Sequence, residues 1–410
     1  MTLTDGLDAR RSAPRSLDPF PYTEHRARPS DQFEFALIAD RAQFAALEHE
    51  WNDLFARAGR PHQLFQAYEW VRHWTNHYLD DRTRLSIVIA RQGGRLVMIW
   101  PLITVRRAGL TRLCWMGEPV SQYGDVLVED GPARFYLLSQ GWAYLKSLGP
   151  DVIHLRKTRE DAAVFPLLRQ AGARSIAVAA APYLDLASAA DYETYQGRYP
   201  AKRRARRRRL LARLGEHGAV AFARHGCGAA AGDFVTEAVR LKYKWLTARG
   251  VVAPVLQDSR FGSFLRDVAV CGGTPAVRVS AVCCDGAAAA IEVSLECKRH
   301  RVAYLISYDV ELAHYGVGIV VAEDSIRTAH EGGLDRFDLL TPADAYKMEW
   351  ADGSIEVHDW AIPLSFAGRI YARVWLGLVK EWMKSSVKTW PVWLRRSLAV
   401  FYRRRYVPAK

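Results

Sequence analysis

A segment between residues 301 and 326 combines residue types that could bind a phosphate. A strand-like run ends in Ser307-Tyr308-Asp309, and His314-Tyr315-Gly316-Val317-Gly318 then leads into an uncapped apolar helix that begins near Ile319. Glycines let backbone N–H groups approach a phosphate closely, and the positive end of the helix dipole favours an anion. An isolated Gly-x-Gly more often marks a tight turn without a ligand, so the surrounding sequence has to decide.

The residues that follow supply this context. The helix is predicted to end at Gly332-Gly333, Arg336 to Leu340 is typical of a short strand, and Tyr346-Lys347 comes next. The chain resembles the CelD-like acetyltransferase family of bacterial polysaccharide biosynthesis, a FemAB-related branch of the GNAT superfamily, over roughly residues 33–363. The resemblance is carried by motifs that are specific only together: Phe65-Gln66-Ala67-Tyr68-Glu69-Trp70, the basic helix from Lys202, Ser307-Tyr308-Asp309, Gly316-Val317-Gly318, Phe337-Asp338, and Tyr346-Lys347 with Trp350.

This sequence departs from the family pattern at three positions. Ala313 stands where the superfamily loop begins with Gln or Arg, Val317 stands where CelD-like chains usually have Pro, and Thr341 stands where they have Gly. The resemblance nevertheless implies an acetyl-CoA site, with no metal, at these residues: Ser307, Tyr308, Tyr315, Gly316, Val317, Gly318 and Ile319.

The resemblance also implies direct transfer of an acyl group from a thioester to an amine or a hydroxyl, without a covalent enzyme intermediate. Such a transfer needs a base and an acid. Asp309 could take the proton of the acceptor, Tyr346 could give one to the leaving thiolate, and Glu292, on an apolar strand, is a rival base. Lys347 completes the predicted catalytic set. For each residue a structural hydrogen bond is the competing interpretation.

The charge of the chain favours an anionic partner. Lys and Arg number 57 against 44 Asp and Glu, a formal net charge of +13, which suits nucleic acid, a lipid surface, a phosphorylated cofactor or an acidic glycan. The densest run, from Lys202 to Arg209, is predicted to be helical and to bind CoA phosphates, a glycan or RNA, or else to be a solvated face. Because CelD-like chains carry a basic helix here, nucleic acid is not favoured.

Two other arrangements do not predict a site. His73 and His77 lie four residues apart, but no acidic or cysteine ligand shares their spacing, so a metal site is not expected. Cys297 lies near His300 without a third orienting residue, so a cysteine nucleophile is not expected either.

The 410 residues exceed what one core usually holds, which predicts two domains. In each half the pattern predicts helices, then a hairpin with a glycine turn, then further strands and helices. The two turns are predicted at Gln92-Gly93-Gly94 and at Asp285-Gly286. We therefore predict a mixed α/β (α+β) class of two tandem GNAT-like domains with mostly antiparallel sheets flanked by helices, plus a helical tail. The predicted bounds are a disordered tail 1–32, domains 33–180 and 181–363 with a linker around 179–191, and a basic amphipathic tail 364–410.

The N-terminal segment and the most apolar stretches of the sequence indicate where in the cell the protein is expected. The first thirty residues lack the apolar stretch of a secretory signal, and the most apolar window is interrupted by Arg91 and Arg95, which predicts a cytoplasmic protein. Apolar residues at helical spacing in the tail, among them Ile370, Val374 and Leu378, alternate with Arg and Lys. This pattern is typical of a helix on an anionic membrane surface, here on its inner face, or docked to a membrane-bound synthase; packing on the second domain would look the same.

Three functions are compatible with these features. The first is an acetyl-CoA-dependent N- or O-acyltransferase for a sugar or sugar-nucleotide in cell-envelope polysaccharide or cellulose biosynthesis. The second is a FemAB-type aminoacyl transferase, in which the arginine helix would hold tRNA. The third is a non-catalytic accessory of a membrane polysaccharide synthase. Tight binding of acetyl-CoA without RNA is expected for the first alone.

Overall fold

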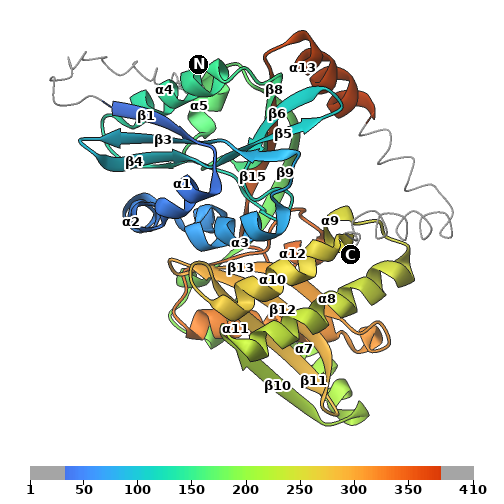
Figure 1. The fold of residues 1–410 in the computed structure, drawn as a ribbon. Coiled ribbons are helices and arrows are strands. Elements are labelled where there is room, and N and C mark those ends of the chain that lie inside the picture. Colours follow the sequence, from blue (N-terminus) through green and yellow to red (C-terminus); the bar gives the residue numbers. More distant parts are fainter. Residues whose placement is uncertain (1–32, 380–410) are drawn as a thin grey trace, which may run out of the picture.

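The computed structural model describes residues 33–379, so the predicted disordered tail 1–32 and the greater part of the predicted basic tail lie outside the described residues. Helices cover both faces of a long sheet that runs through the two halves (Figure 1). The first half contains β1 (Phe33–Ile38), α1 (Arg41–Ala46), α2 (Glu48–Ala58), α3 (Tyr68–Tyr78), β2 (Thr83–Leu85), β3 (Ile87–Gln92), β4 (Arg95–Trp100), β5 (Leu102–Arg107), β6 (Leu110–Trp115), β7 (Leu127–Val128), α4 (Arg134–Ser147), β8 (Val152–Arg159), α5 (Phe165–Gln170) and β9 (Arg174–Asp185).

The second half repeats this order of helices, hairpin, strand and helix, and the predicted mixed α/β class is confirmed. Its elements are α6 (Tyr192–Gly197), α7 (Ala201–His217), β10 (Val220–His225), α8 (Ala229–Arg249), α9 (Pro254–Gln257), α10 (Ser259–Cys271), β11 (Ala276–Cys284), β12 (Ala287–Cys297), β13 (His300–Tyr308), α11 (Val317–Glu331), β14 (Arg336–Asp338), α12 (Ala345–Met348), β15 (Gly353–Pro363) and α13 (Phe366–Ile370), followed by a π-helical segment Tyr371–Val379.

Both predicted hairpins are present. Asp285 and Gly286 have φ angles of 49° and 79°, as a tight hairpin turn between β11 and β12 requires. The hairpin of the first half turns at Gly93-Gly94, but each arm is interrupted, at Ser86 and at Pro101. Beyond these breaks β2 and β5 join the long sheet, whereas β3 and β4 belong to a separate sheet of order β1-β3-β4-β7.

The long sheet has eleven strands in the order β10-β11-β12-β13-β14-β9-β15-β8-β6-β5-β2. Each half contributes one parallel pair joined through a helix: β6 with β8 through α4, and β13 with β14 through α11. The last strands are exchanged between the halves, since β9 pairs with β14 and β15 pairs with β8. This exchange makes one continuous sheet out of two repeated units.

The strand exchange overturns one expectation. Residues 179–185, predicted as part of a linker, lie inside β9, where they hydrogen-bond with β15 and β14. The local composition, rich in alanine and without a strong apolar alternation, hid a strand whose partners come more than 150 residues later in the chain. The predicted domain bounds stay predictions.

The two halves share a hydrophobic core. Trp70 of α3 is fully buried, with its ring 4.9 Å from that of Phe264 on α10 and 5.5 Å from that of Tyr304 on β13. Phe65 and Tyr68 of the same early motif are also buried. This motif therefore builds the contact between the halves.

A buried polar cluster also joins the halves. Asp338 of β14 accepts hydrogen bonds from Tyr123 (2.9 Å), Arg159 (2.8 Å) and the N–H of Leu340 (2.7 Å). Arg159 is also paired with Asp161. Of these donors, Arg159 is the charged one, and its ion pair with Asp338 is buried.

We expect Asp338→Asn to lower the free energy of unfolding by about 3 kcal/mol, because removing one partner of a buried ion pair leaves the other uncompensated. Urea denaturation measures the loss. The control is Asp335→Asn, which breaks an ion pair with Arg299 at the surface and should cost under about 1 kcal/mol. Equal costs for the two variants would contradict the structural role of the Asp338 cluster.

Candidate functional site

The parallel strands β13 and β14 separate soon after they meet. They pair only from His300↔Arg336 to Val302↔Asp338, so residues 303–308 continue along β13 without β14 beside them. The chain then passes through a single 3-10 turn at Ala313–Tyr315 into α11. An opening between two parallel strands and the first turn of a helix therefore lie at the same end of the sheet.

The glycine at the start of α11 is required by the backbone. Gly316 has a φ angle of 69°, and a Cβ atom there would lie 2.8 Å from a methyl group of Leu210 on α7. The N–H groups of Ile319 and Val320 donate to the carbonyl of Gly316.

Two backbone N–H groups at the start of α11, those of Val317 and Gly318, have no hydrogen-bond acceptor within residues 33–379. A Cβ atom on Gly318 would lie 3.3 Å from the ring of Tyr308. The predicted strand, loop and helix are confirmed as elements, and binding of a phosphate there stays a prediction.

Glu292 lies on β12, between the sheet and α11. It is buried, and its Oε1 accepts hydrogen bonds from Ser294 and from Ser325 of α11, each 2.6 Å long. Its Oε2 has no partner in the described structure. Burial raises the pKa of this carboxyl above its usual value, although the two hydroxyls oppose the shift.

Asp309, the other predicted base, is committed to local contacts. Its carboxylate lies 3.2 Å from Nζ of Lys244 and accepts the N–H of Glu311 at 2.9 Å. Partial burial alone would raise the pKa of Asp309, but the Glu311 N–H and the Lys244 ammonium outweigh it, and the pKa is lowered. A carboxylate held in this way is a weak proton acceptor near neutral pH.

Tyr346 and Lys347 follow β14 on the short helix α12. Tyr346 is half exposed, and burial of its remaining surface, with the Asp344 and Glu292 carboxylates, raises its pKa to about 12. Lys347 is buried and donates to the carbonyl of Leu340 at 3.0 Å. Burial is the main cause that lowers the pKa of Lys347.

A second lysine, Lys242 of α8, reaches the opposite side of the opening. Its Nζ donates to the carbonyl of Ile306 on β13 at 3.0 Å, and burial lowers its pKa. Its charge contributes to the lowered pKa of Lys347. Lys242 therefore binds a carbonyl group on β13, and Lys347 binds one two residues beyond the end of β14.

The other predicted binding residues lie around the same opening. Ser307 is buried, and its hydroxyl has no partner in the described chain. Tyr308 accepts a hydrogen bond from the indole of Trp245 at 2.8 Å. The hydroxyl of Tyr315 lies 3.1 Å from Nδ1 of His217, at the end of α7. The structure thus gathers Ser307, Tyr308, the glycine loop, Tyr346 and Lys347, with Asp309 at the margin and Glu292 beneath.

The basic helix α7 lies next to the loop, because Leu210 contacts Gly316. One arginine of the run is structural: Arg207 is buried, stacks 3.6 Å over the ring of Trp350 and lies 3.7 Å from Glu323. The rest of the run is mostly exposed, and its exposed members are Lys202, Arg203, Arg206, Arg208 and Arg209. The exposed residues fit either predicted role of the run, a solvated face or a surface that binds an anion, and the binding role stays a prediction.

The equivalent opening in the first half is filled. Strands β6 and β8 pair only as far as Cys114↔His154, and beyond this point the space holds Trp115 and an ion pair between Glu118 and Arg156. The remaining cavity is about 10 Å³, which is room for no more than a water molecule. Of the two equivalent positions, the opening between β13 and β14 in the second half is therefore the candidate binding site.

Several residues of the site carried no signal in the sequence. Lys242 sits on an amphipathic helix, where a lysine is usually solvated. Ser325 lies within α11 and looks like an ordinary helix position. Tyr123 and Arg159 act on Asp338 from the other half of the chain.

The described residues offer no metal site: within 33–379 no three His, Cys, Asp or Glu side chains are grouped to hold an ion. His77, of the His73 and His77 pair, contacts Asp267 at 2.8 Å. Among the helices in the described part of the chain, none combines the length and apolar character needed to cross a bilayer.

Comparison with known proteins adds three findings. Residues 201–348 match the family model of an acetyltransferase (GNAT) domain. No curated protein matches the sequence. Among solved structures, FemX superposes with a TM-score of 0.58 at 10% identity, covering 83% of this chain and 99% of FemX, a likeness of fold.

Two further solved structures are similar more weakly. A tandem GNAT protein from the clavulanic acid biosynthesis pathway gives a TM-score of 0.45 at 13% identity, covering 82% of this chain and 99% of that one. A GCN5-related N-acetyltransferase from Kribbella flavida gives 0.37 at 13% identity, covering 84% of this chain and 74% of that one.

Proposed function

We propose that this chain, an acyltransferase with a GNAT acetyltransferase domain at residues 201–348, moves an acetyl group from acetyl-CoA to an amine or hydroxyl of a sugar or sugar-nucleotide in cell-envelope polysaccharide synthesis. The observation that carries the proposal is the opening between β13 and β14, which lies at the same end of the sheet as the glycine-capped start of α11. The polysaccharide setting rests on the CelD-like resemblance of the sequence.

The donor would bind along this opening. The free N–H groups of Val317 and Gly318, at the positive end of α11, suit the pyrophosphate of CoA. Helix α7 contacts Gly316 through Leu210, and the exposed cations of this helix suit further phosphate groups. Over residues 303–308 the edge of β13 is not paired with β14. Its backbone groups would form hydrogen bonds with the amide-containing arm of CoA, as they do with a strand added to a sheet edge.

Transfer requires a proton acceptor for the attacking amine or hydroxyl. Glu292 suits this role better than Asp309, because burial raises the pKa of Glu292 and its Oε2 is unpartnered in the described structure, whereas Asp309 is ion-paired with a lowered pKa. As Glu292 is buried, the proton would reach it through the acceptor itself or an intervening water. Lys347 and Lys242 would supply positive charge to the oxyanion that forms at the thioester carbonyl oxygen when the acceptor attacks the carbonyl carbon.

Tyr346 would return a proton to the CoA thiolate. We expect Tyr346→Phe to lower turnover by about 100-fold, since general acid catalysis typically contributes 10²–10⁴, while acetyl-CoA affinity and thermal stability change little. Single-turnover kinetics with calorimetric binding checks this. The control is Tyr136→Phe, which removes the hydroxyl of an exposed tyrosine on α4. Undiminished turnover in Tyr346→Phe would reassign Tyr346 to packing.

Calorimetry with a panel of acyl-CoAs, in the absence of RNA, tests the proposed donor. We expect saturable binding of acetyl-CoA and release of free CoA when an amino sugar is added. One observation favours a second function, aminoacyl transfer from tRNA: α7, which contacts the loop through Leu210, carries several exposed arginines. Dependence of turnover on aminoacyl-tRNA would support it, and failure to bind any acyl-CoA or RNA would point to a non-catalytic accessory.

The segment after β15 has an exposed apolar side. Ser365 donates to Asp151 and Arg112 donates to Tyr371, so the segment is fixed to the first half rather than to the second domain. Phe366 nevertheless is 72% exposed and Trp375 is 47% exposed. Residues 380–410 are rich in Lys and Arg. We propose that this surface and the basic tail associate with the anionic inner face of the membrane.

Vesicle sedimentation tests this association. The full chain should bind vesicles that contain anionic lipid, and a chain ending at Val379 should bind them at least about tenfold more weakly, because each basic residue near the surface contributes about 1 kcal/mol. Phe366→Ser should also weaken binding. Neutral vesicles are the control. Equal sedimentation of the full and shortened chains would contradict the proposal.

A further inference from the structure

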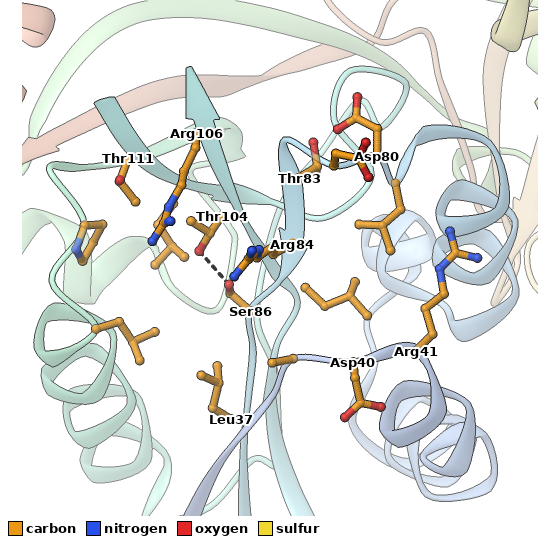
Figure 2. Close-up of a pocket in the computed structure, with 17 residues that line it drawn as sticks. Leu37, Asp40, Arg41, Asp80, Thr83, Arg84, Ser86, Thr104, Arg106 and Thr111 are labelled. Carbon is orange, nitrogen blue, oxygen red and sulfur yellow. Dashed lines mark hydrogen bonds between the residues drawn. The ribbon is translucent and has the colours of Figure 1, made fainter. Parts of the chain in front are cut away.

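A sizeable cavity lies in the first half, away from the acyl-transfer site. It has a volume of about 680 Å³, within the range of about 300–1,000 Å³ that small-molecule sites occupy. It lies where the chain leaves the small sheet for the long one, between the end of β1 and the strands β2, β5 and β6 (Figure 2). From β14 to β2 the sheet order gives six strand spacings of about 4.8 Å, a separation on the order of 25–30 Å.

One wall of this cavity is a face of the sheet that carries two arginines. Arg84 of β2 lies opposite Thr104 of β5, and Arg106, two residues further on β5, lies opposite Thr111 of β6. These side chains therefore share one face, and Figure 2 shows Arg84 and Arg106 pointing into the cavity. Within residues 33–379 neither guanidinium has a hydrogen-bond or ion-pair partner at its side chain. Two neighbouring cations on one sheet face repel each other unless an anion lies between them.

Hydroxyl groups complete this wall. The hydroxyls of Ser86 and Thr104 lie 2.6 Å apart, so one of them donates to the other and the second keeps its own hydrogen for a ligand. The Thr111 hydroxyl lies beside Arg106 (Figure 2). Two guanidinium groups with neighbouring hydroxyl donors form a suitable set for a phosphate.

The facing side carries three aspartates, together with Arg41, whose guanidinium donates to the carbonyl of Thr75 at 3.0 Å. Asp40 and Asp80 each use one carboxylate oxygen, Oδ1, to accept a backbone N–H, from Gln43 and from Arg82 respectively. Asp81 also lines this side. No ion pair joins these aspartates to Arg84 or Arg106, so the two walls stay apart across the cavity. Carboxylates accept hydrogen bonds and cannot donate them, so they suit hydroxyl groups on a ligand.

We propose that this cavity binds a phosphorylated sugar, with its phosphate on Arg84 and Arg106 and its hydroxyl groups toward Asp40 and Asp80. The ligand must carry an anionic group at one end and hydrogen-bond donors at the other to match both walls. The separation of the cavity from the opening between β13 and β14 makes it a second binding site, and the proposal does not depend on the acyl-transfer reaction.

Calorimetric titration of the full chain with glucose 6-phosphate tests the proposal, with glucose and inorganic phosphate as comparison probes. Glucose 6-phosphate should bind saturably and more tightly than either comparison probe. Substituting Arg84→Gln with Arg106→Gln should weaken binding of glucose 6-phosphate at least about tenfold, because both substitutions remove charge-assisted hydrogen bonds to the phosphate.

The matched control carries Arg82→Gln with Arg107→Gln. These arginines adjoin the same strands but do not line the cavity, and the substitution removes the same charge. The control should bind glucose 6-phosphate as the natural chain does, and acetyl-CoA affinity should be equal in all three proteins. The proposal is overturned if the natural chain shows no saturable binding, if the control loses as much affinity as the cavity variant, or if inorganic phosphate binds as tightly as the sugar phosphate.

Discussion

Substituting Gly318 by aspartate should lower the affinity for acetyl-CoA by about tenfold or more. The residue lies in the first turn of α11, where its N–H group has no acceptor and the helix dipole is positive. A carboxylate there would repel the pyrophosphate. The fold should survive, because Gly318 does not have a positive φ angle and an acidic residue near a helix N-terminus is favourable.

The matched control for this variant is Gly318→Ala. It adds a Cβ atom 3.3 Å from the Tyr308 ring without adding charge, so it reports the steric part of the effect alone. We expect the alanine variant to lose much less affinity than the aspartate variant in calorimetry. If both variants are folded and both bind acetyl-CoA like the natural chain, the assignment of the loop is wrong.

Replacing Glu292 by glutamine should reduce turnover by about 100-fold or more, because the amide cannot accept the proton that a general base would take. Glutamine keeps the shape of the side chain and an oxygen for the hydroxyls of Ser294 and Ser325. The comparison variant is Asp309→Asn, which removes the rival base. It should retain most of the turnover. If Asp309→Asn instead loses more turnover than Glu292→Gln, then Asp309 is the proton acceptor.

The same variant has an expected signature in stability. Burial raises the pKa of Glu292 above the ordinary 4.5, so the folded state keeps a proton that the unfolded state has already released. The contribution of Glu292 to stability is therefore complete below pH 4.5 and falls as pH rises through the raised pKa. As pH rises from 4.5 through the raised pKa, the free energy of unfolding of the natural chain should therefore fall relative to that of the Glu292→Gln variant. A parallel pH dependence of the two proteins in urea denaturation would show that the pKa is not raised.

Local patterns predicted the parts of the fold that depend on neighbouring residues. Asp285-Gly286 fixed the turn of the hairpin, and the flanking strands begin and end where the alternation indicated. The loop at Gly316 was also recognisable, because the need for a positive φ angle and the close approach of Leu210 both select glycine. The position of Tyr346 and Lys347 just after β14 follows from their order in the chain.

Other features depend on partners far away in the sequence. The sequence predicts a linker from residue 179, inside β9, because the pairing of this strand with β14 and β15 is decided by residues 336–361. Lys242 gave no signal because only the tertiary structure brings its Nζ to the carbonyl of Ile306. Likewise, the preference for Glu292 over Asp309 rests on burial and on the contact with Lys244, which spacing alone cannot reveal.

Hydrogen–deuterium exchange of the full chain with and without acetyl-CoA tests the location of the donor site most directly. The amides of Val317 and Gly318 have no acceptor in the described structure, so their exchange should slow when a pyrophosphate accepts them. We expect protection at 316–320 and along β13, and none at the filled opening of the first half near Trp115. Saturating acetyl-CoA that leaves exchange at 316–320 unchanged, or that protects the first half instead, would contradict the proposed site.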